Sequence, residues 1–176
     1  MRIITLITLG TMAGSGTALR AQAGDGHARD VQLSMLEHQR KTLLAMADSM
    51  PERLYRDKAT PAQRDFAQQV GHAAGSAAYI ASSVLKGPAM SLPDSGSSFN
   101  SRAGLRTFIN AAFDYSAGVF KGQTAAARTQ TANLFGTSMP AWQVWDEIYT
   151  HTIWTAGQIV ANFRKNGMAP PAFTFF

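Results

Sequence analysis

Two stretches of the chain decide its fold and its candidate site: RDFAQQVGHAAGSAAYI at residues 64–80 and WDEIYTHTIWTAGQIVANFRKNGM at residues 145–168. In each, apolar residues recur at three- and four-residue spacing, which is typical of an amphipathic helix. Each carries one histidine, His72 or His151, in a polar stripe beside the apolar face. Two such stripes can meet as a polar seam between packed helices, or they can both face solvent. Periodicity alone leaves both arrangements open.

Two further helices complete an all-α pattern. The predicted helices span Asp30–Met50, Pro61–Lys86, Arg102–Lys121 and Pro140–Asn166. Thr60 is expected to be the N-cap of the second helix, with Pro61 in its first turn, and Gly167 is expected to cap the fourth. No segment alternates at period two for long enough to predict a sheet, and the connector after the third helix could hold a short helical turn.

The N-terminus reads as a secretory signal peptide. Arg2 begins a short apolar run, and Ala21-Gln22-Ala23 fits the small-x-small rule for cleavage. The run is far shorter than the roughly 20 apolar residues of a membrane-spanning helix. We therefore predict residues 1–23 as the signal peptide and residues 24–176 as one domain, periplasmic or secreted, without stable membrane insertion after cleavage.

Composition narrows the classes of partner. The formal net charge is +5, and cleavage would remove two of those charges with Arg2 and Arg20. The remaining basic residues are scattered, so nucleic acid is not an expected partner. The chain has no cysteine. It therefore needs no oxidative folding, and any thiol taking part in its chemistry must come from a ligand.

The two histidine segments resemble the DinB/YfiT-like superfamily. MPERLYRDKATPAQRDF between the first two helices, Phe113-Asp114-Tyr115 and the FRKNGMAPP ending add to the resemblance, which covers most of residues 24–176. It implies a four-helix bundle with one long crossover connection, commonly holding a divalent metal on three histidines. By this resemblance His72 and His151 match two of the metal ligands.

The third ligand position differs from the family pattern. The family usually has His-x-x-x-His-x-Gly-Gln here, whereas this chain has His151, Thr155, Gly157 and Gln158. Threonine is a poor ligand for a divalent metal. Glu147, one turn before His151, could contribute a carboxylate, although it is out of register with the family ligand. Gln158 matches the family glutamine that follows the ligands and could support them from behind.

Two functions remain open from the sequence. One is a metal-dependent protein that resembles thiol transferases, using zinc or nickel at low occupancy on His72 and His151. The alternative is a non-enzymatic exported bundle that has lost its ancestral metal site and binds a small molecule. Whether the protein is catalytic and whether it forms a homodimer are left open, and a thiol or another small molecule is the expected ligand.

The other polar candidates have simpler interpretations. His38 points away from the apolar face of the first helix and is expected in solvent, and His27 lies in the N-terminal segment of the predicted mature chain. Arg40 lies on the apolar side of the first helix, where it could extend its charged end to water or meet a buried acid, and extension to water is expected. Gly71 and Gly75 lower helix propensity, which predicts a close contact of the second helix with a bulky neighbour.

Overall fold

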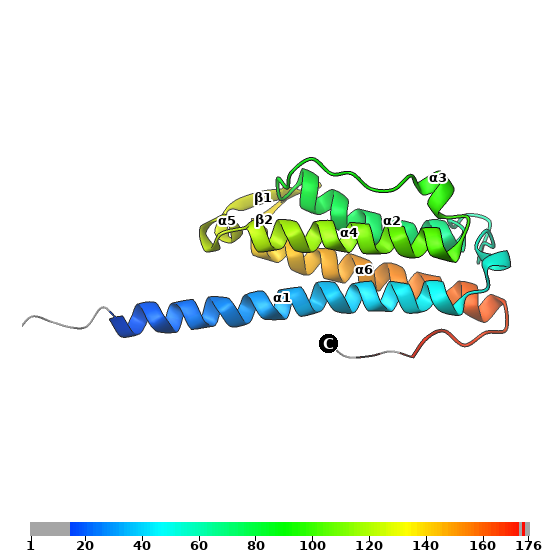
Figure 1. Ribbon diagram of the computed structural model, residues 1–176, viewed down its shortest axis with the longest axis horizontal. Coiled ribbons are helices and arrows are strands. Elements are labelled where there is room, and N and C mark those ends of the chain that lie inside the picture. Colours follow the sequence, from blue (N-terminus) through cyan, green and yellow to red (C-terminus); the bar gives the residue numbers. More distant parts are fainter. Residues whose placement is uncertain (1–14, 173, 175–176) are drawn as a thin grey trace, which may run out of the picture. The chain divides into compact units, whose positions relative to one another are not determined.

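The computed structural model describes residues 15–172 and 174, and for residues 15–25 the backbone alone. The all-α class is confirmed for these residues, which are mostly helical. The helices are α1 (Ser15–Ser49), the 3-10 helix η1 (Glu52–Leu54), α2 (Phe66–Ser83), α3 (Ser95–Ser98), α4 (Arg102–Gly122), α5 (Ala125–Thr129) and α6 (Ala141–Lys165) (Figure 1).

The chain divides into two compact units, residues 1–31 and 32–176, and α1 contributes to both. The apolar part of the predicted signal peptide lies largely in residues 1–14, outside the described residues, so its cleavage stays a prediction. Among the described helices, none is both long and apolar enough to cross a membrane. The candidate site belongs entirely to the second unit.

Helix α2 packs against both α4 and α6 (Figure 1). Its alanines are buried almost completely, which lets the neighbouring backbones approach closely, and the second half of α1 adds Leu43, Met46 and Ala47 to the same core. Of the three tryptophans, Trp145 is buried, whereas Trp142 and Trp154 are exposed. The bulky side of the core therefore comes mainly from phenylalanines and Trp145.

Helix α2 begins later than the sequence predicts. Its N-cap is Asp65, not Thr60, because Asp65 and Gln68 form a reciprocal capping box. The Asp65 carboxylate accepts the Gln68 amide N–H at 2.8 Å, and the Gln68 side-chain oxygen accepts the Asp65 amide N–H at 3.1 Å. This pair satisfies two N–H groups at the helix start, whereas the prediction at Thr60 rested on residue preference alone. Residues 59–63 form turns and bends instead.

A small hairpin was not predicted. Strands β1 (Thr131–Leu134) and β2 (Thr137–Pro140) pair antiparallel, with Leu134 opposite Thr137. Phe135 and Gly136 form the two-residue turn, both with positive φ, as a type I′ turn requires. Strands of four residues are too short to show a clear alternation of apolar and polar residues, so the sequence did not indicate them. The expected short helical turn in the same connector is confirmed as α5.

The two glycines of α2 meet aromatic rings. A Cβ atom added at Gly71 would lie 2.0 Å from the tip of the Phe99 ring, whereas one at Gly75 would lie 3.5 Å from the Phe108 ring. The expected close contact is therefore confirmed at Gly71. The bulky partner is Phe99, in the turn before α4.

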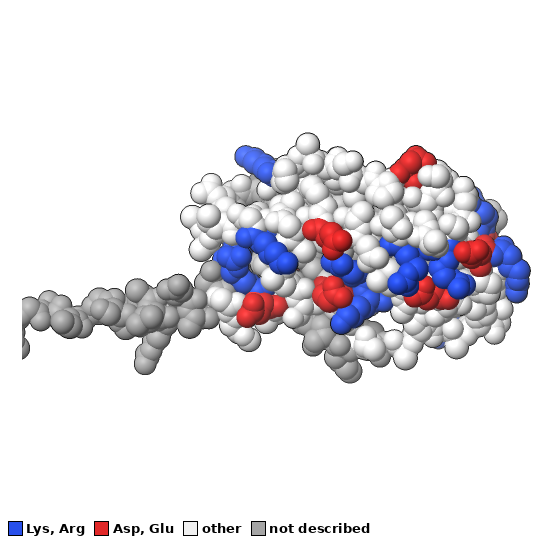
Figure 2. All heavy atoms as spheres, viewed as in Figure 1, with Lys and Arg blue, Asp and Glu red and all other residues white. Residues whose placement is uncertain are grey.

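Charged residues of both signs interleave in a band along the face shown in Figure 2. Arg40 of α1 pairs with Asp114 of α4 at 2.8 Å and with Glu37 at 3.3 Å. Arg40 therefore meets an acid instead of extending freely to water, but that acid is exposed on the neighbouring helix rather than buried. A second ion pair, Arg106 with Asp48, joins the same two helices.

Candidate functional site

The structure brings the two predicted histidines together. His72 on α2 and His151 on α6 have ring centroids 5.2 Å apart, in an edge-to-face arrangement at 77°. Both side chains are half-buried. Of the two arrangements that the sequence leaves open, the polar stripes form the seam between α2 and α6. Their role as metal ligands stays a prediction.

A second contact lies in the same seam. The Gln69 amide donates a hydrogen bond to the Gln158 side-chain oxygen at 2.7 Å, again joining α2 to α6. Ser76, one turn after His72, places its hydroxyl 3.4 Å from Nδ1 of His72. Gln158 was predicted to hold the metal ligands in position by hydrogen bonding. In the structure it accepts a hydrogen bond from Gln69 of the opposite helix. The seam is held by uncharged polar side chains around two imidazoles.

Both imidazoles favour the neutral form. Burial lowers the pKa of His72 and of His151, and the positive charge of Arg64 lowers both further. His151 also lowers the pKa of His72, since two cations at this distance repel. At neutral pH each ring is therefore uncharged and can donate one hydrogen bond and accept another.

Thr155 follows His151 by one turn of α6 and is only 2% exposed. Glu147, one turn before His151, is half-buried. Among the described residues, no three His, Cys, Asp or Glu side chains lie close enough together to hold a metal ion. A structural or catalytic zinc site uses at least three such protein ligands. The residues present therefore do not fit the three-ligand set that the resemblance implies.

Arginines beside the histidines were missed in the sequence. A cavity of about 580 Å³ opens next to His72, and the residues that line it are Arg56, Arg64, Gln68, Gly71, His72, Ser95, Gly96, Phe99 and Phe108. Arg64 precedes the first residue of α2 by two positions. Helical periodicity therefore does not indicate where its side chain points. The only feature of the sequence that could have indicated Arg64 as part of the site is its nearness to His72 along the chain.

Two polar contacts hold the Arg56 side chain in the lining of this cavity. It pairs with the buried Asp65 carboxylate at 3.2 Å and donates to the Asn100 side-chain oxygen. Arg64 acts on both imidazoles through its charge. The site thus combines two neutral imidazoles with a nearby guanidinium, a set of donors that suits an anionic or polarisable ligand.

His38 lies in a different place from the one predicted. It is 8% exposed rather than in solvent, and its ring centroid lies 6.3 Å from that of Tyr149 on α6. The prediction considered a single apolar face of α1. In the structure α6 and the C-terminal segment cover a second face of this helix, and His38 is buried there. His27 is exposed and belongs to the first unit.

Comparison with models of known protein families and with curated proteins gives no match. The geometry of the seam therefore has to support any functional assignment by itself.

Proposed function

We propose that this protein is an exported DinB-like four-helix bundle that binds a small anionic molecule in the seam between α2 and α6. The resemblance of the histidine segments supports the family, and the four long helices suit it. The expected crossover would fall among the connections between α1, α2, α4 and α6.

One observation carries the binding role: His72 and His151 lie 5.2 Å apart as neutral rings beside a cation. A carboxylate or thiolate could accept hydrogen bonds from the imidazoles, while Arg64 would favour its charge. Binding of an anion would in turn stabilise the imidazolium forms, because opposite charges at short distance favour ionisation. A bound anion should thus raise the pKa of both histidines.

Paired ligands test this proposal. Thioglycolate and glycolate differ only in a thiol against a hydroxyl, and both carry a carboxylate. We expect either to bind and to raise the histidine pKa values measured by NMR of the imidazole ring protons. Arg64→Gln should weaken binding, whereas Lys86→Gln, just beyond the opposite end of α2, also removes one positive charge and serves as the control. Unchanged histidine titrations at saturating concentrations of both ligands would contradict the proposal.

A second candidate keeps a divalent metal at the seam. The two neutral imidazoles favour it, since metal ions bind the unprotonated ring. His72 and His151 would supply two ligands for zinc or nickel, fewer than the three of a catalytic zinc site, so water or Glu147 would have to complete the shell. Calorimetric titration with Zn²⁺ on protein purified without an affinity tag separates the candidates. One tight equivalent that is lost in His72→Gln would favour the metal site over the anion site.

Export rests on the predicted signal peptide and is tested separately. The mature chain is expected to begin at Gly24. An intact mass of protein recovered from the cell envelope that still includes residues 1–23 would refute cleavage.

A further inference from the structure

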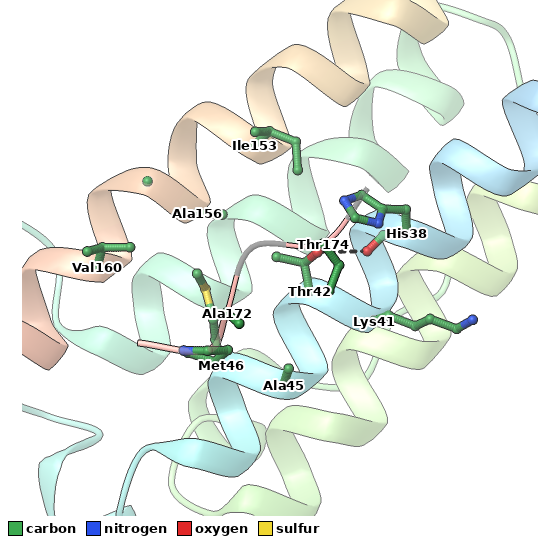
Figure 3. Close-up of a pocket in the computed structure, with 12 residues that line it drawn as sticks. His38, Lys41, Thr42, Ala45, Met46, Ile153, Ala156, Val160, Ala172 and Thr174 are labelled. Atoms are coloured by element: carbon green, nitrogen blue, oxygen red, sulfur yellow. Dashed lines mark hydrogen bonds between the residues drawn. The ribbon is translucent and has the colours of Figure 1, made fainter. Parts of the chain in front are cut away.

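A second cavity lies on the opposite side of α6 from the histidine seam, between α6, α1 and the C-terminal segment (Figure 3). Its volume is about 400 Å³, within the range of roughly 300–1,000 Å³ typical of small-molecule sites. The described residues that line it are His38, Lys41, Thr42, Ala45, Met46, Ile153, Ala156, Gly157, Val160, Pro171, Ala172 and Thr174. It includes neither His72 nor His151.

The lining is divided into a polar end and an apolar end. His38, Lys41 and Thr42 lie together on α1, and Ala45 and Met46 follow about one turn after Lys41 and Thr42. From His38 to Met46 the helix rises by about 12 Å. The α6 wall offers only aliphatic side chains and Gly157. A ligand that fits this division has an apolar body of similar length and one polar end.

The polar end is basic. Among the described residues that line the cavity none is acidic, whereas His38 and Lys41 both carry basic nitrogens. The Thr42 hydroxyl donates to the His38 carbonyl at 2.9 Å, so it is occupied by the helix itself. In Figure 3 the amine of Lys41 is directed away from the other labelled side chains, and the His38 ring lies between α1 and α6. His38 is therefore the residue placed to meet a polar head inside the cavity.

We propose that this cavity binds a single-chain amphiphile, an unbranched alkyl chain that ends in a carboxylate. The carboxylate would accept a hydrogen bond from the His38 imidazole, with Lys41 at the rim adding long-range attraction. The chain would lie along Ala45 and Met46 towards Val160 and Pro171, which are all apolar. This site is independent of the seam, so either proposal can fail without the other.

Calorimetry with hexanoate, octanoate and decanoate, each below its micellar concentration, measures the chain contribution. We expect affinity to rise about fourfold with each added methylene, because each buried methylene contributes about 0.8 kcal/mol. Octanol is the neutral match to octanoate and should bind more weakly. His38→Leu should remove the preference for octanoate over octanol. Equal binding of octanol and octanoate to the natural chain would overturn the carboxylate assignment.

Variants that fill the cavity locate the binding. Ala45→Leu should weaken octanoate binding by roughly tenfold or more, equivalent to about 1.4 kcal/mol. Ala161→Leu, exposed on α6 outside the cavity, makes the same chemical change and should leave binding unchanged. His72→Gln should also leave it unchanged. If Ala45→Leu lowers the melting temperature, Val160→Phe fills the cavity from the opposite wall.

The contrary results are equally clear. Octanoate binding that survives both filling variants, or that disappears in His72→Gln, would place the ligand elsewhere and overturn the proposal. So would the absence of heat and of any change in melting temperature with all three carboxylates.

Discussion

Replacing Gly71 with alanine tests whether the floor of the histidine cavity is built as described. The added methyl would lie 2.0 Å from the Phe99 ring, and ordinary contact begins at 3.4 Å. The ring, or α2, must therefore move by about 1.4 Å. Phe99 is only 8% exposed, so the ring is confined on most sides. Overpacking of this kind typically costs 1–3 kcal/mol, while alanine regains about 1 kcal/mol of helix propensity.

The expected net result is a loss of stability of about 1 kcal/mol, which lowers the melting temperature by about 2–4 °C for a chain of this length. Urea unfolding followed by far-UV circular dichroism measures it. Gly75→Ala is the matched control, because its methyl would meet the Phe108 ring at an ordinary 3.5 Å. This variant should be stabilised by up to about 1 kcal/mol.

A double mutant decides the cause. In a Phe99→Leu background the ring atoms that meet the methyl are absent, so Gly71→Ala should become neutral or stabilising. Since Gly71 and Phe99 both line the cavity beside His72, Gly71→Ala should also weaken thioglycolate binding, whereas Gly75→Ala should not. If Gly71→Ala is as stable as Gly75→Ala in the natural background, the described contact does not constrain the cavity.

Three further outcomes follow from the site and its helix. Because folding lowers the pKa of His72 and His151 below 6.5, their contribution to stability is present above about pH 6.5 and is lost as pH falls below it; thermal melts between pH 7.5 and 5 should show this decline, reduced in the His72→Gln, His151→Gln double variant. Thr155→His should cost about 1–3 kcal/mol without metal, since Thr155 is buried, and Zn²⁺ at a hundredfold excess over its Kd should return about 2.7 kcal/mol; no metal-dependent rise in melting temperature would show that the assigned register is wrong. Asp65→Ala should lose about 1 kcal/mol or more by urea unfolding, because it removes the N-cap, and Asp65→Ser should recover part of the loss; equal losses in the two variants would show that the Arg56 pair, not the cap, holds this helix start.

Much of the helical framework follows from local sequence. The predicted limits of the fourth helix, Pro140–Asn166, differ from those of α6 by one residue at each end, because Pro140 and Gly167 act on the backbone next to them. The predicted start at Arg102 matches α4, whose N-cap is Ser101. The predicted start of α2 after Thr60 was wrong because the reciprocal bonds of Asp65 and Gln68 cap the helix five residues later.

The sequence predicts the two polar stripes, but it does not predict that they contact each other. Periodicity places His72 and His151 each on a face of its own helix, but it does not indicate which neighbour that face meets. The contact of 5.2 Å depends on how α2 and α6 are packed. That packing depends in turn on the small residues of α2 and on the apolar side chains of both helices together.

Residues outside regular helices, and those near the chain end, depended most on tertiary structure. His38 was expected in solvent because one helix alone presents one apolar face; α6 and the C-terminal segment bury another. Arg64 precedes α2, where no period fixes the direction of a side chain, and yet its charge acts on both histidines. Local bonds and spacing thus determine which residues form helices. Contacts between residues distant in sequence decide which polar groups share a site, because only the packed chain brings them within the few ångströms over which hydrogen bonds and charges act.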